Sequence, residues 1–152
     1  GQAEQAAAFY VSIFKNSKIT DVSHYSEAGK EQHEQEPGSA MVVAFELDGQ
    51  AFTGLNGGPT FKFSEAISFQ IMCADQDEVD YYWSRLAEGG EHGPCGWLKD
   101  RFGVSWQVVP TRLNELIADP DTARAQRAFQ AMLGMKKIDI AEVERAADAV
   151  PA

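Results

Sequence analysis

The segment GPCGWLKDRFGVSWQVVP, residues 93–110, contains the side chains best suited to carry out chemistry. Cys95 is a candidate nucleophile, because a thiolate beside a base or a cation attacks electrophilic substrates, and His92 lies three residues before it. Two arguments favour a passive thiol instead. An isolated cysteine is more often a small buried hydrophobe, and three steps along one strand place His92 and Cys95 on opposite faces. Catalysis by Cys95 is therefore the weaker of two open interpretations.

Other residue types that build active sites form no clear pattern. No GxSxG elbow occurs, and the serines near the histidines have no ordered spacing. His33 lies close to Glu34 and Glu36, which is a possible metal-binding combination. However, the surrounding run EAGKEQHEQEPG, residues 27–38, is charged and lacks apolar periodicity, which is typical of a solvated loop. We predict no metal and no organic cofactor.

Composition limits the class of protein. The chain has 152 residues, 44% of them hydrophobic and 24% charged, which fits one compact soluble domain. Its formal net charge of -10 argues against a nucleic-acid partner, because binding phosphates requires clustered lysine and arginine. There is no apolar run of about 20 residues and no leader pattern, so we expect a cytoplasmic protein without a membrane partner. Cys73 and Cys95 lack metal or disulfide spacing and are expected to be free thiols.

The first half of the chain is expected to form a helix, a strand, a loop and a hairpin. Apolar residues recur at three- and four-residue steps over residues 3–14, which predicts an amphipathic helix. A strand is expected at 19–26, and the apolar run AMVVAFEL at 40–47 is typical of a strand covered on both faces. Asp48-Gly49 predicts a type I′ turn, because both central positions of that turn need a positive φ angle, and QAFTGL returns.

The second half repeats this order and continues into helices. ISFQIMC, residues 67–73, alternates like a strand, and an apolar stripe over 76–88 predicts a helix ended by two glycines. HGPCGWLK and GVSWQVV then form a hairpin that Pro110 ends. We expect Asp119 to cap a following helix and Asp139 to cap the last one. The apolar side of these helices, able to pack on the sheet or on a second subunit, consists of Phe129, Met132 and Leu133.

The two halves form an internal repeat. Each has an aromatic-rich helix (FYVSIF, then YYWSRL), a strand, and an apolar hairpin that turns at an aspartate (ELDGQAF, then LKDRFGVSW). The second half has the strand ISFQIMC before its helix, whereas the first half begins in its helix at GQAEQAAAFY. We therefore expect about eight to ten residues before Gly1 that form the corresponding strand.

The segments GQAEQAAAFYVSIFKNSKI, LNGGPTFKFSEAISFQI, EVDYYW and CGWLKDRFGVSWQVVP resemble the PhnB-like family, often labelled 3-demethylubiquinone-9 3-methyltransferase. That family is part of the vicinal oxygen chelate superfamily of glyoxalases, dioxygenases and bleomycin resistance proteins. The resemblance implies an α+β fold of paired βαβββ modules that form cupped mixed sheets, followed by C-terminal helices. We expect a single domain over 1–152, with module one at about 1–58, module two at about 65–110 and helices at about 111–150.

The methyltransferase label by itself predicts little chemistry. Methyl transfer from S-adenosylmethionine normally uses a glycine-rich loop between a strand and a helix. The glycine-rich piece here, NGGP, joins two predicted strands, and no nucleotide fingerprint is present.

The superfamily resemblance also locates the positions of a metal site. Metal-dependent members hold a divalent ion with histidine and glutamate side chains from separate strands. Their usual histidine would fall at Ala66, and DRFGVSWQ resembles the common DPDGxxxE pattern with Gln107 in the place of the glutamate. An amide oxygen lacks the charge that offsets dehydration of the cation. We therefore expect Gln107 to hydrogen-bond a ligand or a neighbouring side chain.

Strand parity then extends this implied cavity. If Ala66 and Gln107 face it, so do Ser68 and Gln70 on one strand and Ser105 on the other, while the residues between them form core. Alternatively, these polar side chains only hydrogen-bond each other. A wall of amides and hydroxyls, without carboxylate or imidazole, suits a neutral ligand better than a divalent cation. The predicted ligand-binding residues are Ser68, Gln70, Trp97, Ser105 and Gln107, and the predicted core residues are Ile67, Phe69, Ile71, Trp106 and Val108.

Three functions stay open at this point. The first is a metal-free small-molecule-binding protein, expected to be a homodimer because superfamily members commonly build their cups near a subunit interface. The second is an enzyme acting on a small or quinone-like substrate, with a metal completed by the absent strand or a step that depends on Cys95. The third is a sequestering protein like the bleomycin resistance relatives. Whether the protein is an enzyme stays undecided.

Overall fold

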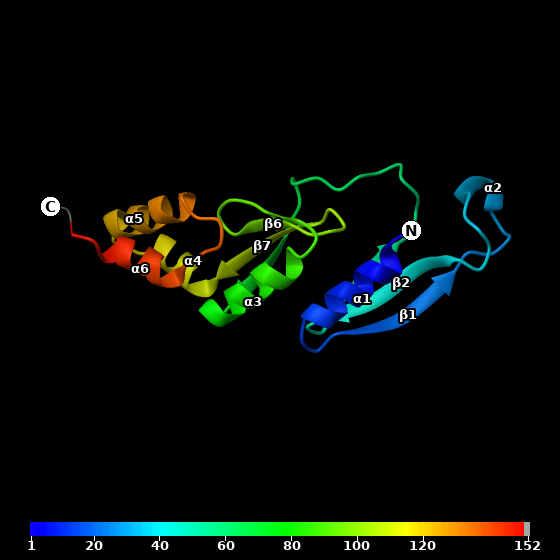
Figure 1. Ribbon diagram of the computed structural model, residues 1–152, viewed down its shortest axis with the longest axis horizontal. Helices are drawn as coiled ribbons and strands as arrows, with labels where there is room; N and C mark the ends of the chain where they lie inside the picture. The colour runs from blue at the N-terminus through cyan, green and yellow to red at the C-terminus, as the bar shows by residue number, and fades with distance from the viewer. Residues whose placement is uncertain (151–152) are drawn as a thin grey trace. The chain divides into compact units, whose positions relative to one another are not determined.

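The computed structural model describes residues 1–150 and has the expected α+β architecture (Figure 1). These residues form two open sheets and six helices. The chain divides into two compact units, which we call unit one (residues 1–62) and unit two (from Phe63 onward). Among residues 1–150, no helix combines the length and the apolar character needed to cross a membrane.

Unit one is a helix with a three-stranded antiparallel sheet. Its strands follow the order β1-β2-β3. The turn between β2 and β3 has positive φ angles at Asp48 (48°) and Gly49 (79°), as the predicted type I′ turn requires. The elements are α1 (Ala3–Ile13), β1 (Lys18–His24), α2 (Lys30–His33), β2 (Ala40–Leu47) and β3 (Gln50–Leu55).

The core of unit one lies between α1 and one face of β2. Every second residue of β2 from Val43 onward is buried, and the ring of Phe45 stacks on Tyr10 of α1 with 6.3 Å between centroids. The intervening residues of β2 are only half-buried. Helix α1 therefore covers one face of this strand, and the expected cover on the second face stays a prediction.

The charged segment 27–38 is mostly exposed, as expected, but it contains the helical turn α2. The imidazole of His33 packs on the ring of Tyr25, with centroids 4.6 Å apart, and its Nδ1 accepts a hydrogen bond from the amide of Gln35 at 2.9 Å. The sequence pattern did not predict this helical turn, because a single contact between two rings leaves no periodic signal in the sequence.

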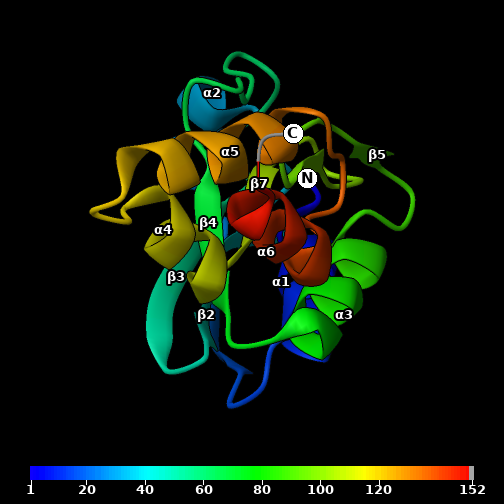
Figure 2. The same cartoon turned by 90° about the vertical axis from the view of Figure 1, so that its left-hand side faces the viewer.

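Unit two contains a four-stranded sheet with the order β4-β7-β6-β5. Strand β4 runs parallel to β7, whereas β6 pairs antiparallel with both β5 and β7. Figure 2 shows α4, α5 and α6 gathered beside one another. The elements are β4 (Phe69–Cys73), α3 (Gln76–Leu86), β5 (Glu91–His92), β6 (Trp97–Lys99), β7 (Ser105–Pro110), α4 (Thr111–Ile117), α5 (Thr122–Leu133) and α6 (Ile140–Asp148).

The run HGPCGWLK is not one strand arm, contrary to the prediction. A turn separates β5 from β6, with Cys95 at φ 56° and Gly96 at φ 83°. The amide of Gly93 donates to the carbonyl of Trp97 at 2.8 Å, and the amide of Trp97 donates to the carbonyl of Pro94 at 3.0 Å. Glycine and proline favour such a turn over an extended strand. Strand parity therefore does not relate His92 to Cys95.

The hairpin between β6 and β7 is organised by the buried carboxylate of Asp100, which is 3% exposed. One oxygen accepts the amides of Phe102 at 2.8 Å and Val104 at 3.1 Å. The other accepts the indole N–H of Trp106 at 2.9 Å. The aspartate thus satisfies the backbone of its own turn, and the bond to Trp106 also ties the turn to the core.

Helix α3 packs under this sheet and forms the main core of unit two. Its residues Val79, Trp83 and Leu86 are buried, as are the predicted core residues Ile71, Trp106 and Val108. The prediction is wrong for Ile67, which is 76% exposed, and for Phe69, which is 43% exposed. Strand β4 begins only at Phe69, so Ile67 lies in the loop before it.

The helices α4, α5 and α6 surround a second core that includes Leu116, Ile138 and Val143. Met132 packs against this core, whereas Phe129 and Leu133 are 45% and 48% exposed. The apolar side predicted from these three residues is therefore split between a buried and an exposed surface.

The caps of these helices follow the prediction in part. Asp139 caps α6 by accepting the amide of Glu142 at 3.1 Å, as expected. The cap of α5 is Asp121 and not Asp119, because the chain becomes helical only from Thr122. Asp119 instead accepts the amide of Asp121 at 2.8 Å and pairs with Arg124.

Candidate functional site

One row of side chains crosses three strands of the unit-two sheet. Gln70 of β4 lies opposite Gln107 of β7, and Gln107 lies opposite Trp97 of β6. Directly paired residues point to the same face of a sheet, so these three side chains share one face, as strand parity predicts. The neighbouring row, with Trp106 at its centre, faces the opposite way toward α3.

The polar members of this row are joined by hydrogen bonds. The side-chain amide of Gln107 donates to the hydroxyl of Ser68 at 2.9 Å. The amide of Gln70 donates to the side-chain oxygen of Gln107 at 3.4 Å. The interpretation that these side chains hydrogen-bond each other is thus correct for three of them. In this arrangement the Ser68 hydroxyl can still donate a hydrogen bond, and the side-chain oxygen of Gln70 can still accept one.

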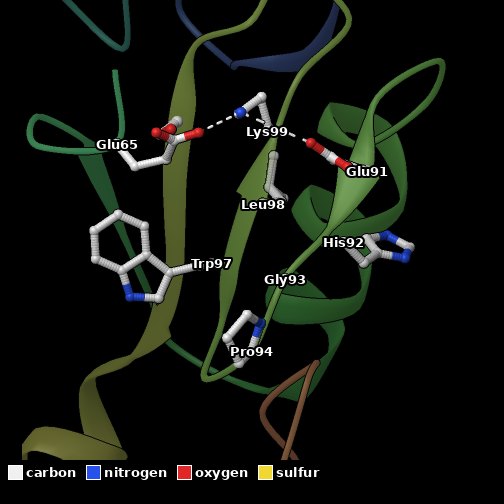
Figure 3. A pocket seen from close by; sticks show the side chains of 9 residues that line it. Glu65, Glu91, His92, Gly93, Pro94, Trp97, Leu98 and Lys99 are labelled. Carbon is white, nitrogen blue, oxygen red and sulfur yellow. Dashed lines mark hydrogen bonds and ion pairs between the residues drawn. The ribbon is translucent and has the colours of Figure 1, made fainter.

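An open pocket of about 490 Å³ lies beside this row (Figure 3). It contains the predicted residues Trp97, which is half-buried, and Ser105, which is 4% exposed. Trp97 therefore contributes a partly open indole surface, whereas Ser105 offers little accessible surface. The lining residues are Glu65, Glu91, His92, Gly93, Pro94, Trp97, Leu98, Lys99 and Ser105.

A lysine between two carboxylates forms one end of the pocket. The ammonium group of Lys99 on β6 is hydrogen-bonded to Glu65, and it lies 3.8 Å from a carboxylate oxygen of Glu91 (Figure 3). The hydrogen bond from Lys99 lowers the pKa of Glu65, and the same bond raises the pKa of Lys99. The expected wall without carboxylate or imidazole is therefore wrong, although these two carboxylates are engaged by the lysine.

Sequence reasoning missed the Glu65–Lys99–Glu91 cluster for a physical reason. Glu65 lies in the loop before β4, and Glu91 and Lys99 lie on separate short strands that pair with each other. Their spacing along the chain carries no signal of their contact. The opposite charges of Glu91 and Lys99 indicate a contact only when the turn that pairs β5 with β6 is in place.

The structure does not bring His92 and Cys95 together as a catalytic pair. The imidazole of His92 stacks on Trp83, with ring centroids 4.4 Å apart and planes 7° apart, and Figure 3 shows it pointing away from Trp97. Cys95 is half-buried in the turn. Burial raises the pKa of the other thiol, Cys73, to about 12, which disfavours its thiolate.

The residues at the positions of a metal site do not fit a divalent cation. Ala66 is apolar and lies in the loop before β4, and the amide of Gln107 is engaged by Ser68 and Gln70. Within residues 1–150, no three histidine, cysteine, aspartate or glutamate side chains are arranged to hold a metal ion.

The residues also do not fit an S-adenosylmethionine loop. The NGGP segment follows β3, and a strand rather than a helix is the next element. Its Asn56 is committed to unit one, because its side chain accepts the amide of Ala3 and donates to the carbonyl of Ala40, both at 3.0 Å.

The fold and this face define an α+β protein of two related open-sheet units, one of which carries a polar row and an adjoining pocket. Residues 1–109 match the model of the family described as 3-demethylubiquinone-9 3-methyltransferase, and the chain belongs to that family. Helices α4 to α6 lie beyond the matched residues.

Solved structures similar to this chain include two with related folds. A PhnB protein from Bacillus cereus, which carries the same family description, shares 32% sequence identity, and the match covers 73% of this chain and 92% of that chain with a TM-score of 0.62. A protein from Pseudomonas aeruginosa shares 18% identity over 72% of this chain and 90% of that chain, with a TM-score of 0.56, which supports the fold alone. No curated protein matches the sequence.

Proposed function

We propose that unit two binds a small neutral or weakly polar molecule at the face formed by Trp97, Gln107 and Gln70, without a divalent metal. The observation that carries this proposal is the alignment of one indole and two amides in a single row across β6, β7 and β4. An indole offers a flat apolar surface, and amides offer directional donors and acceptors. The row adjoins the open pocket at Trp97, and a concave site that combines apolar surface with a few directional polar groups is typical of small-molecule binding.

The electrostatics of the pocket favour a neutral ligand over an anion. Lys99 is the cation that lines the pocket, and its ammonium group already lies between Glu65 and Glu91. An anionic ligand would have to compete with these carboxylates. A neutral molecule can use the Ser68 hydroxyl as a donor and the Gln70 oxygen as an acceptor without breaking the ion pair.

Fluorine NMR of protein labelled with 5-fluorotryptophan tests this proposal. The chain has three tryptophans, so Trp97→Phe assigns the relevant resonance. Benzamide is flat and neutral, with one carboxamide that supplies a carbonyl acceptor and an NH2 donor, and benzoate is its anionic counterpart. We expect benzamide to shift the Trp97 resonance at lower concentration than benzoate. Gln107→Ala removes the side chain that holds the Ser68 hydroxyl and the Gln70 amide in place, and it should weaken benzamide binding by about 5- to 10-fold, comparable to the cost of one net hydrogen bond.

Gln130→Ala is the matched control, because Gln130 is an exposed glutamine of α5. Equal binding of benzamide to the wild type and to Gln107→Ala would contradict the proposal, as would a response confined to the other two tryptophans. Stoichiometric binding of Mn²⁺, Ni²⁺ or Zn²⁺ that Gln107→Ala abolishes would overturn its metal-free part.

A further inference from the structure

The main chain of Trp97 is held by the turn that precedes it. Its amide donates to the carbonyl of Pro94 at 3.0 Å, and its carbonyl accepts the amide of Gly93 at 2.8 Å. Gly93 and Pro94 also line the pocket. The position of the indole in the pocket therefore depends on the conformation of residues 93–96.

The two residues of this turn with positive φ angles are hydrogen-bonded to the segment between α5 and α6. The amide of Cys95 donates to the carbonyl of Met135, and the amide of Gly96 donates to the carbonyl of Lys136, both at 2.8 Å. Cys95 has a φ of 56°, a left-handed conformation that costs roughly 1 kcal/mol for a residue with a side chain. The two hydrogen bonds hold the backbone in that conformation.

The packing around Gly96 leaves no room for a side chain. A Cβ atom there would lie 2.8 Å from the carbonyl oxygen of Val108 and 3.3 Å from a side-chain carbon of Ile138. The side chain of Ile138 is fully buried. The turn is therefore enclosed between β7 on one side and the α5–α6 segment on the other.

The other side of this segment is fastened to the first turn of α3. The side-chain amide of Gln76 donates to the carbonyl of Ile138, and its oxygen accepts the amide of Ile140, both at 2.9 Å. The carboxylate of Asp80 accepts the same Gln76 amide at 3.0 Å and lies 2.9 Å from the ammonium of Lys137. Residues 135–140 are thus bonded on both sides.

We propose that residues 135–140, which we call the α5–α6 clamp, position Trp97 and set the shape of the pocket. The chain of contacts runs from Gln76 through the clamp to the amides of Cys95 and Gly96, and from the turn to both main-chain polar groups of Trp97. A movement of α5 or α6 is transmitted to the pocket by this route. The consequence for ligand binding rests on the proposed function, whereas the positioning of Trp97 does not.

The clamp lies outside the part of the chain that matches the family model, which ends at residue 109. The matched residues build the sheet that carries the pocket, and the C-terminal helices hold the segment that controls its shape. Because the side chain of Gln76 bonds to main-chain atoms of both Ile138 and Ile140, it is the positioning residue to test.

The experiment compares Gln76→Ala with Gln130→Ala in the full chain. Gln76→Ala removes both hydrogen bonds from this side chain to the clamp. Amide hydrogen exchange at Cys95 and Gly96 should accelerate by about 5- to 10-fold, because part of that support is transmitted to the turn. The 5-fluorotryptophan resonance of Trp97 should shift, while those of Trp83 and Trp106 stay. Lys137→Met, which removes only the exposed ion pair with Asp80, should give the same changes with smaller amplitude.

Unchanged exchange at Cys95 and Gly96 in folded Gln76→Ala would overturn the proposal. A uniform change at all three tryptophans would do the same, because it would indicate general destabilisation instead of local positioning. Benzamide affinity separates this inference from the proposed function. If Trp97 moves and benzamide binds Gln76→Ala as tightly as wild type, the clamp does not control the site, whereas the Gln107→Ala result still decides whether the site exists.

Discussion

Strand β3 of unit one and strand β7 of unit two hold the same place in the repeat, directly after a hairpin that turns at an aspartate. Their burial is opposite: four of the six residues of β3 are exposed, and five of the six residues of β7 are buried. Within residues 1–150, β3 pairs only with β2, whereas β7 pairs with both β6 and β4. Similar position in a repeat therefore does not determine burial, which depends on the neighbours that each strand acquires.

The two units are also held together by different interactions. In unit one, ring contacts link Tyr10, Phe45 and Phe52, with centroid distances of 6.3 Å and 5.7 Å. Every ion pair among residues 1–150 lies in unit two. The unit that carries the polar row is thus also the one that uses charged contacts.

The largest difference in the free energy of unfolding should come from replacing the turn aspartate of each unit. Asp100→Ala removes the acceptor of three hydrogen bonds in a buried site and should lower the free energy of unfolding by about 3 kcal/mol. Asp48→Ala is the matched change at an exposed turn and should cost less than about 1 kcal/mol. Urea unfolding measures both, and equal losses would show that burial is not what distinguishes the turns.

Alanine substitutions in β7 and β3 should differ by a smaller amount in their cost to the free energy of unfolding. Val108→Ala in β7 deletes fully buried methyl groups and should cost about 2 kcal/mol. Leu55→Ala in β3 removes a larger side chain that is 64% exposed, and should cost less than about 0.5 kcal/mol. Thermal unfolding of both variants provides the measurement. A larger loss for Leu55→Ala would mean that the exposed edge of β3 is covered in solution.

The smallest expected effect is the pH response of the Glu65–Lys99 pair. Because Lys99 lowers the pKa of Glu65, the stabilisation from this pair is complete above the ordinary carboxyl pKa and is lost as the pH falls through the lowered value. Lys99→Met should return the Glu65 pKa toward its ordinary value, which carbon NMR of the carboxyl group can follow.

Lys137→Met serves as the control for this titration, because Lys137 pairs with Asp80 and not with Glu65. It should raise the lowered pKa of Asp80 in part, since the hydrogen bond from Gln76 is the larger cause of that shift. A Glu65 pKa that is the same with and without Lys99 would contradict the ion pair that closes one end of the pocket.

The amino-acid sequence by itself determined most of the elements and one face of the site. Apolar periodicity located α1 and α3, and Asp48-Gly49 located the first hairpin, because these signals depend on residues a few positions apart. Strand parity together with the family resemblance placed Gln70 and Gln107 on a shared face, since alternation along a strand is a local property.

Only the tertiary structure decided the rest of the site. Glu65 meets Lys99 across 34 residues, and Gln76 meets Ile140 across 64 residues, so no local pattern could indicate either contact. In the turn that separates β5 from β6, the amides of Cys95 and Gly96 donate to carbonyls of the distant clamp, and Cys95 adopts a left-handed conformation that local propensity disfavours. Local preferences select helices and strands, but side chains far apart in sequence acquire partners only when the packed chain brings them together.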